Sequence, residues 1–265
     1  MSLSRKQILD EMGLSPQWTL REEPGVARRA KTITEAQPAP RGQSPESSKP
    51  VLSEAMRALV TANTAQTERA ASIAQMDWEA LQSSAADCQV CGLCAERKQA
   101  VLGVGDVKAG WLFIGEGPGA EEDARGEPFV GPAGKLLDAM LAAIDLQRGE
   151  DVYIANAVKC RPPGNRTPEA AEIKACFPYL QRQIALIQPK LIVLLGRVAV
   201  SAVLGEEGAL ASLRGKSLVY RDGERDIPVL VTYHPAYLLR NLPDKAKAWE
   251  DLCRARALMR SATNQ

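Results

Sequence analysis

The stretch WLFIGEGPGAEEDARGEPFVGPAG, residues 111–134, joins an apolar run to a glycine-rich turn and the start of a predicted helix. Residues 111–114 are all apolar, which is typical of a buried strand. The segment GEGPG at 115–119 holds three glycines, which adopt backbone angles that other residues avoid. Open α/β folds bind ligands where a strand ends in such a turn. The carboxylates and the single aromatic residue that follow suit a polar, planar ligand better than a phosphate.

Apolar runs and helical segments alternate through the rest of the chain. Starting with a strand, the alternating elements are expected at 111–114, 133–144, 152–157, 168–187, 191–195, 199–204, 229–233 and 244–259. This order predicts an α/β fold with three layers, αβα, around a central, mainly parallel four-stranded sheet. The glycine-rich turn, Asn156 and His234 each follow a strand, so we expect them to meet at one edge of the sheet.

The N-terminal third differs in composition from the remainder. Residues 1–23 are expected to form a short helical segment. Residues 24–50 hold proline, serine and scattered charges with few large apolar side chains, which predicts a flexible linker. Residues 51–84 are alanine-rich and are expected to form a helical arm, either docked on the main domain or solvated. The main domain is expected at 85–265.

Composition and charge set broad limits on function. The 265 residues carry a formal net charge of +1, so a nucleic-acid partner would require a local basic face. Neither a signal-peptide core nor an apolar stretch of membrane-spanning length is present, which favours a cytoplasmic protein without a membrane partner. In that compartment the six cysteines indicate thiols or metal ligands rather than disulfides.

Four of the six cysteines form two pairs in the sequence. Cys88 and Cys91 precede the first strand, and Cys160 and Cys176 follow the second. Two such pairs near one sheet can supply four thiolates to a metal site, and both zinc and iron–sulfur centres accept four cysteines. The spacing does not distinguish these two centres. Cys94 adds a second CxxC spacing and could replace one ligand.

The single histidine of the chain, His234, directly follows an apolar strand and precedes a proline. This position places it at the sheet edge where the glycine-rich turn is expected. A multi-histidine metal centre is excluded, and a Ser–His–Asp hydrolase is disfavoured because the chain has no GxSxG turn. An imidazole at this edge could donate a hydrogen bond to a developing anion.

With these features placed, the chain resembles the family-4 uracil-DNA glycosylases, the iron–sulfur branch of their superfamily, in a bacterial form with an N-terminal extension. The resemblance covers about residues 85–258. The matching motifs are CxxCxLCxxR at 88–97, GEGPGxxED at 115–123, GxPFVGxAGxLL at 126–137, NxVKCRPPxNRxP at 156–168 and HPAYLLRN at 234–241. A related branch carries a KRRIH-type loop with a histidine, whereas this chain has CRPPGNRTP there.

The resemblance implies that residues 85–265 form a catalytic domain that removes uracil from DNA and leaves an abasic site. It implies a structural 4Fe-4S cluster held by Cys88, Cys91, Cys160 and Cys176. We further expect a monomer that contacts uracil-containing DNA, with residues 1–80 free to bind a protein partner.

The expected chemistry assigns a task to each residue at the sheet edge. Uracil in DNA must leave the base stack to be reached, and Phe129 offers a flat face for it. The amide of Asn156 can read N3–H and O4 together, a pattern that cytosine reverses. His234 would stabilise the departing uracil anion, assisted by backbone N–H groups around Gly117. A carboxylate near the sugar would orient water, with Glu116 the first candidate; Glu122 is the second.

DNA contacts are expected from the same edge. Arg240 is placed to meet a phosphate, and the neighbouring Leu238 could wedge into the gap left by the flipped base. The wider basic face would include Arg161, Arg166, Arg214, Lys216, Lys245 and Lys247.

The same residues admit two rival interpretations. A dinucleotide-binding oxidoreductase is disfavoured because the turn lacks GxGxxG spacing, Pro118 has no N–H, and Glu116 would repel phosphates. A non-catalytic iron–sulfur module that binds DNA in replication or repair remains the alternative; it would be favoured by the loss of Glu116, Asn156 or His234, and all three are present.

Overall fold

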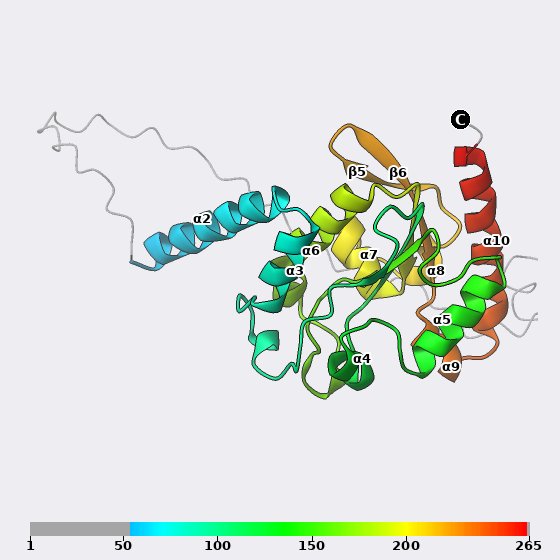
Figure 1. Cartoon of the computed structure of the whole chain (residues 1–265), viewed down its shortest axis with the longest axis horizontal. Helices are drawn as coiled ribbons and strands as arrows, with labels where there is room; N and C mark the ends of the chain where they lie inside the picture. The colour runs from blue at the N-terminus through cyan, green and yellow to red at the C-terminus, as the bar shows by residue number, and fades with distance from the viewer. Residues whose placement is uncertain (1–53, 264–265) are drawn as a thin grey trace, which may run out of the picture. The chain divides into compact units, whose positions relative to one another are not determined.

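The computed structural model describes residues 54–263, so the predictions for residues 1–23 and 24–50 lie outside the described residues. Six strands within the described residues form one sheet (Figure 1). In spatial order they are β1 (Val104–Gly105), β3 (Val152–Asn156), β2 (Trp111–Gly115), β4 (Leu191–Leu195), β6 (Arg225–Thr232) and β5 (Leu218–Asp222). The four inner strands are parallel, and the two edge strands are antiparallel to their neighbours.

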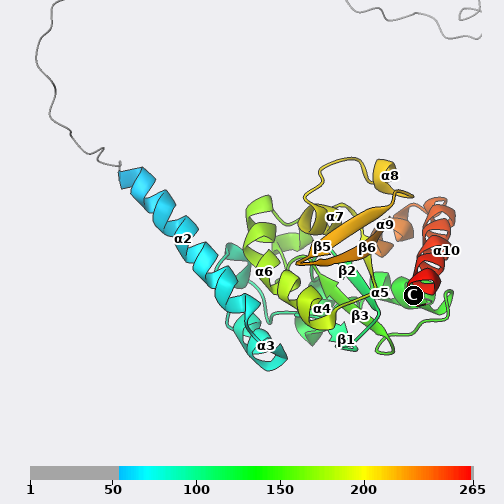
Figure 2. The same ribbon diagram turned by 90° about the horizontal axis from the view of Figure 1, so that it is seen from above.

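Helices cover both faces of this sheet. The longer ones are α5 (Pro132–Ala142), α6 (Ala170–Ile187), α7 (Arg197–Leu204) and α10 (Asp244–Thr263). Because side chains alternate along a strand, Trp111 and Phe113 of β2 pack with α5 and α10, while Leu112 and Ile114 pack with α6 and α7. Figure 2 shows α6 and α10 on opposite sides of the strands. The three-layer α/β prediction is therefore confirmed.

The sheet has two more strands than the four predicted. All four predicted strands are present as the parallel centre, β2, β3, β4 and β6. The two additional strands, β1 and β5, lie at the edges. β1 is only two residues long, and β5 alternates between exposed and buried residues. An edge strand needs no continuous apolar run, which is why the pattern of buried strands did not reveal them.

Short helices lie between the predicted elements. The carboxylate-rich segment after the glycine-rich turn forms α4 (Ala120–Arg125). Two further short helices are α8 (Leu210–Leu213), which follows α7, and α9 (Pro235–Arg240), which follows β6. The 3-10 turns η1 (Gly92–Cys94) and η2 (Pro163–Asn165) lie in the cysteine segment and in the proline-rich loop.

Within the described residues, two α-helices precede the sheet in the chain, α2 (Glu54–Ala74) and α3 (Trp78–Ala86). The end of α2 is docked: Arg69 Nη1 donates to the carbonyl of Ala175 at 2.9 Å, and Ile73 is 2% exposed. Trp78, at the start of α3, packs against Tyr153 of β3 with ring centroids 5.5 Å apart. Residues of both helices thus contact the part of the chain that forms the sheet and α6. No helix in the described part of the chain could cross a membrane.

Candidate active site

A pocket of about 510 Å³ opens at the carboxyl ends of the parallel strands. It lies where the strand order reverses, because β2 is followed by β3 on one side and by β4 on the other. Open α/β sheets bind ligands at this position. Eight predicted site residues line the pocket: Glu116, Gly117, Glu122, Phe129, Asn156, Arg166, His234 and Arg240. The pocket therefore brings together eight of the residues that the sequence singled out.

Asn156 and Phe129 meet at the end of the paired strands β2 and β3. Gly115 lies opposite Asn156 in the parallel register. A Cβ atom on Gly115 would lie 2.5 Å from Asn156 Oδ1 and 2.5 Å from Phe129 Cζ, so only glycine leaves room for both side chains. Asn156 is 2% exposed, and its Oδ1 has no hydrogen-bond partner among the described residues. A buried, unpaired amide oxygen is costly, which is typical of a group that awaits a ligand.

His234 caps the N-terminus of α9 and faces Phe129. The ring centroids of His234 and Phe129 are 5.4 Å apart with an interplanar angle of 30°. His234 Nδ1 accepts a hydrogen bond from the N–H of Ala236 at 3.2 Å, so the proton of the neutral ring is on Nε2. Burial, and secondly the charge of Arg240, lower the pKa of His234 to about 4. The histidine is therefore neutral at pH 7 and can donate from Nε2.

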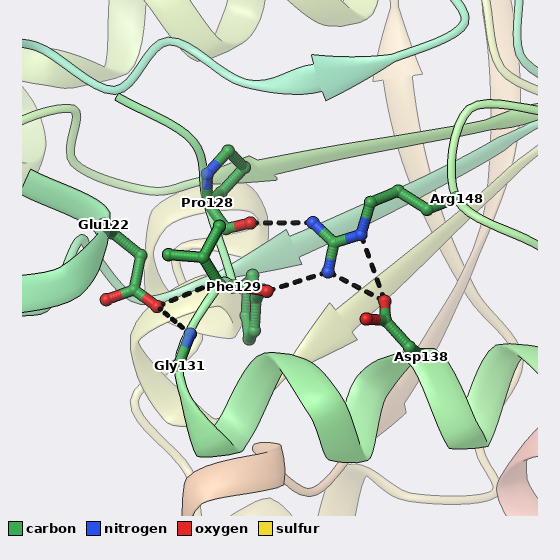
Figure 3. Close-up of polar contacts among 7 residues, drawn as sticks. Glu122, Pro128, Phe129, Gly131, Asp138 and Arg148 are labelled. Atoms are coloured by element: carbon green, nitrogen blue, oxygen red, sulfur yellow. Dashed lines mark hydrogen bonds and ion pairs between the residues drawn. The ribbon is translucent and has the colours of Figure 1, made fainter. Parts of the chain in front are cut away.

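Glu116 and Glu122 have different surroundings. Burial raises the pKa of Glu116, and a hydrogen bond with Thr167 partly opposes this shift. Glu122 lies with both carboxylate oxygens on backbone amides: Oε2 accepts from Gly119 at 3.0 Å, and Oε1 accepts from Val130 at 3.0 Å and from Gly131 at 3.1 Å. Figure 3 shows the contact with Gly131. Both carboxylates line the pocket, but Glu122 is bound to the backbone amides of two loops, whereas Glu116 pairs with the side chain of Thr167.

The predicted cations divide into free and paired groups. Arg240 is exposed at the pocket, whereas Arg166 donates to both oxygens of Glu172, at 2.8 Å and 2.6 Å. Arg161 lies outside the pocket lining and donates to Asn165 Oδ1 at 2.7 Å. The prediction that Arg214 contributes to a basic face is wrong. Its side chain is 13% exposed and lies 2.7 Å from buried Asp251, so it belongs to the interior.

The prediction of a wedge at Leu238 is wrong. Leu238 is 1% exposed and lies in the core between the sheet, α5 and α10. Helix α9 turns this side chain inward and leaves its neighbour, Leu239, 41% exposed. A side chain that enters a base stack must be accessible, so Leu239 is the leucine of this pair that fits the role.

The predicted cysteines lie together, away from the pocket. Cys88, Cys91, Cys160 and Cys176 line one small cavity, with Cys94 also in its wall. Several N–H groups point at the sulfurs: Arg69 Nη2 at 3.7 Å from Cys88, Arg97 Nη1 at 2.8 Å from Cys160, and the Lys159 amide at 3.3 Å from Cys176. Burial raises the pKa of Cys176 to about 12, so a thiolate there needs a positive partner such as bound metal. Across the described residues, no three Cys, His, Asp or Glu side chains are grouped to hold a single metal ion.

Three residues that the sequence did not single out belong to the site. Tyr237 lines the pocket from α9, and Thr167 pairs with Glu116 from the proline-rich loop. Tyr237 lies within the HPAYLLRN motif, and this position could have identified it from the sequence. The third, Arg148, donates to the carbonyls of Pro128 and Phe129 (Figure 3). It lies outside every motif and left no signal in the sequence.

Comparison with known proteins identifies the family. The model of the uracil DNA glycosylase superfamily matches residues 102–253. The chain is 45% identical over 177 residues to a type-4 uracil-DNA glycosylase of Sulfurisphaera tokodaii, which covers 65% of this chain and 80% of that protein. Proteins of the same name from Pyrobaculum aerophilum and Thermotoga maritima are 41% and 42% identical; the alignments cover 67% and 65% of this chain and 92% and 90% of those proteins. The chain belongs to the uracil DNA glycosylase superfamily.

Proposed function

We propose that this protein is a DNA-repair enzyme whose pocket holds a uracil rotated out of DNA, and that it hydrolyses the N-glycosidic bond of that nucleotide. The observation that carries the proposal is the unpaired, buried Oδ1 of Asn156 beside Phe129. A planar ligand with an N–H donor satisfies this oxygen while it stacks on the aromatic ring. The relatives, named type-4 uracil-DNA glycosylases, point to uracil as that ligand.

Asn156 supplies the selectivity for uracil. Its Oδ1 accepts from uracil N3–H, and its Nδ2 donates to uracil O4. Cytosine presents an acceptor at N3 and a donor at the exocyclic amine, so both contacts would be lost. Since Asn156 is buried, unpaired polar atoms would remain on both partners, and such mismatches reject a ligand strongly.

The chemical step breaks the bond between C1′ of the sugar and N1 of uracil. The bonding electron pair leaves with the base, and His234 Nε2–H donates to uracil O2 to stabilise the resulting anion. Water forms the new bond to C1′ and releases a proton, which neutralises the departed uracil anion. Glu116 orients this water and stabilises the positive charge that develops on the sugar. Glu122 is less suited to this role because its carboxylate is bound to backbone amides.

DNA is held at the rim of the pocket. Arg240 contacts a backbone phosphate. Arg161 and Arg166 add positive charge from the proline-rich loop, and Arg166 keeps its ion pair with Glu172. Leu239, which is 41% exposed, enters the gap that the flipped nucleotide leaves. The expected protein partner of residues 1–80 and the monomeric state remain part of this proposal.

The cysteine site is proposed to hold a 4Fe-4S cluster through Cys88, Cys91, Cys160 and Cys176. The cluster serves as a structural crosslink and takes no part in the bond cleavage. One observation supports it: the four cysteines line one small cavity, with N–H donors directed at three of their sulfurs.

The test is base release from oligonucleotides that carry one deoxyuridine, single-stranded or opposite G or A, followed by alkaline cleavage of abasic sites. The wild type is expected to produce cleavage at uracil only, Asn156→Ala to abolish it and His234→Ala to reduce it strongly. Iron and sulfide analysis of each variant ensures that the cysteine site is equally loaded. If a wild type with a loaded cluster retains DNA but releases no base, the enzyme assignment fails, and a DNA-binding module replaces it.

A further inference from the structure

The loop that carries Phe129 is held in an unusual backbone conformation. Phe129 has a φ of 56°, in the left-handed region that large side chains rarely adopt. Its ring is nevertheless buried, with 5% of its surface exposed, between Gly115 and His234. Such a conformation persists only where the surroundings fix it, and these conformations gather at functional sites.

Two charged side chains hold this loop from opposite directions (Figure 3). Arg148 donates from Nη1 to the carbonyl of Pro128 and from Nη2 to the carbonyl of Phe129, both at 2.8 Å. Glu122 accepts from the two following amides, those of Val130 and Gly131. The peptide groups on both sides of Phe129 are therefore fixed by charged partners, which make the stronger class of hydrogen bond.

Arg148 is itself fixed by α5. Its Nε and Nη2 donate to Asp138 Oδ1 at 3.0 Å and 2.8 Å. The Arg148 side chain is 23% exposed, and Asp138 is 51% exposed. The guanidinium thus bridges the aspartate and the two carbonyls, which the several donors of the arginine fork allow and a lysine ammonium does not.

We propose that Arg148 is a positioning residue for uracil recognition: it sets the backbone of Phe129, and through it the plane of the ring on which uracil stacks. This inference rests on the proposed function, because Phe129 must be the stacking face. Arg148 does not line the pocket, so it acts through Phe129 and not by touching the base. The wider consequence is that an arginine outside the pocket determines affinity for the flipped base.

The experiment is a double-mutant cycle on free uracil inhibition and on single-stranded uracil release. Base stacking accounts for about a 5- to 150-fold change in affinity, so Arg148→Gln is expected to raise the Ki of free uracil and the KM by about 5-fold or more. Arg148→Lys is expected to behave like Arg148→Gln, because one ammonium cannot reach both carbonyls and Asp138. Arg221→Gln, at an 84% exposed arginine on β5, is the matched control and should leave both constants unchanged.

The double-mutant cycle then tests whether Arg148 acts through the ring of Phe129 or through a general loss of structure. In a Phe129→Leu background, which keeps an apolar side chain at this buried position, Arg148→Gln should change Ki by less than about 2-fold, because its effect passes through the missing ring. An undiminished effect in that background, or full activity of Arg148→Lys, overturns the proposal. A fall of about one in the salt slope of DNA binding would instead make Arg148 a phosphate contact.

Hydrogen exchange keeps this inference distinct from the proposed function. Absence of uracil release by the wild type contradicts the glycosylase assignment alone. Exchange of the amides of Val130 and Gly131 is independent of activity, and Arg148→Gln should accelerate it relative to Arg221→Gln. If Arg148→Gln leaves the exchange of these amides unchanged, the proposed role of Arg148 is overturned, even in an enzyme that releases uracil.

Discussion

The side chains of Asn156 and Phe129 pack against Gly115 and fit there because this residue has no Cβ atom. Gly115→Ala would put a Cβ atom 2.5 Å from both Asn156 Oδ1 and Phe129 Cζ. Because a misplacement of about 1 Å can cost about 100-fold in rate, we expect kcat/KM for uracil release to fall by about that factor. Gly208→Ala, whose Cβ would meet only Ser212 Oγ at 3.7 Å, is the matched control. Equal rates for the two variants would contradict this packing.

The pH dependence of activity follows from two residues. Burial raises the pKa of Glu116 above 4.5, so ionised Glu116 is lost on the acid side at a higher pH than for an ordinary glutamate. The pKa of His234 is lowered from 6.5 to about 4, so its neutral form is already present throughout neutral pH. We expect kcat/KM to rise with pH through the pKa of Glu116 and then stay level to pH 8. A fall in activity near pH 6.5 that His234→Ala removes would mean that a charged imidazole is required.

At the scale of elements, the segment after β3 connects the pocket to the cysteine site. Lys159 is 1% exposed; its Nζ donates to the carbonyl of Asn156 at 2.8 Å and to Gln183 Oε1 of α6 at 2.5 Å. Lys159→Met would leave both acceptors buried without this donor, which costs about 1–3 kcal/mol. We expect Tm to fall by about 2–10 °C, measured against Lys190→Met, an exposed lysine. An unchanged Tm would show that the ammonium contributes no net stability.

The elements that the sequence predicted are those with a repeating physical signal. Four apolar runs gave the parallel strands, and the polar residues that follow them gave Asn156 and His234 at one edge. The edge strands β1 and β5 are half-exposed and lacked that signal. Leu238 and Leu239 are chemically alike, so only the direction of α9 decides which is buried.

Arg148 could not be predicted for a different reason. It binds main-chain carbonyls 19 and 20 residues away, and such contacts leave no pattern of side-chain types. Glu122 shows the same limit: its place in an acidic segment suggested water activation, but the contacts that define its role are with backbone amides.

For the whole molecule, the net charge of +1 provides little attraction to DNA, so affinity must come from local contacts at the pocket rim. Arg240 is exposed at the rim, whereas Arg166 is paired with Glu172. We expect Arg240→Gln to weaken DNA binding and to reduce the slope of log K against log salt by about one, because one phosphate contact is lost. The control Arg221→Gln should leave the slope unchanged. If both slopes match the wild type, Arg240 does not contact a phosphate.

The central claim, that the pocket reads uracil through the amide of Asn156, is tested most directly by single-turnover release of uracil and of cytosine from otherwise identical oligonucleotides. The wild type should release uracil and no cytosine. Asn156→Asp, which replaces the donor nitrogen by an oxygen, should lose uracil release and shift the ratio of rates towards cytosine. Cytosine release by the wild type, or an unchanged ratio in Asn156→Asp, would contradict the account.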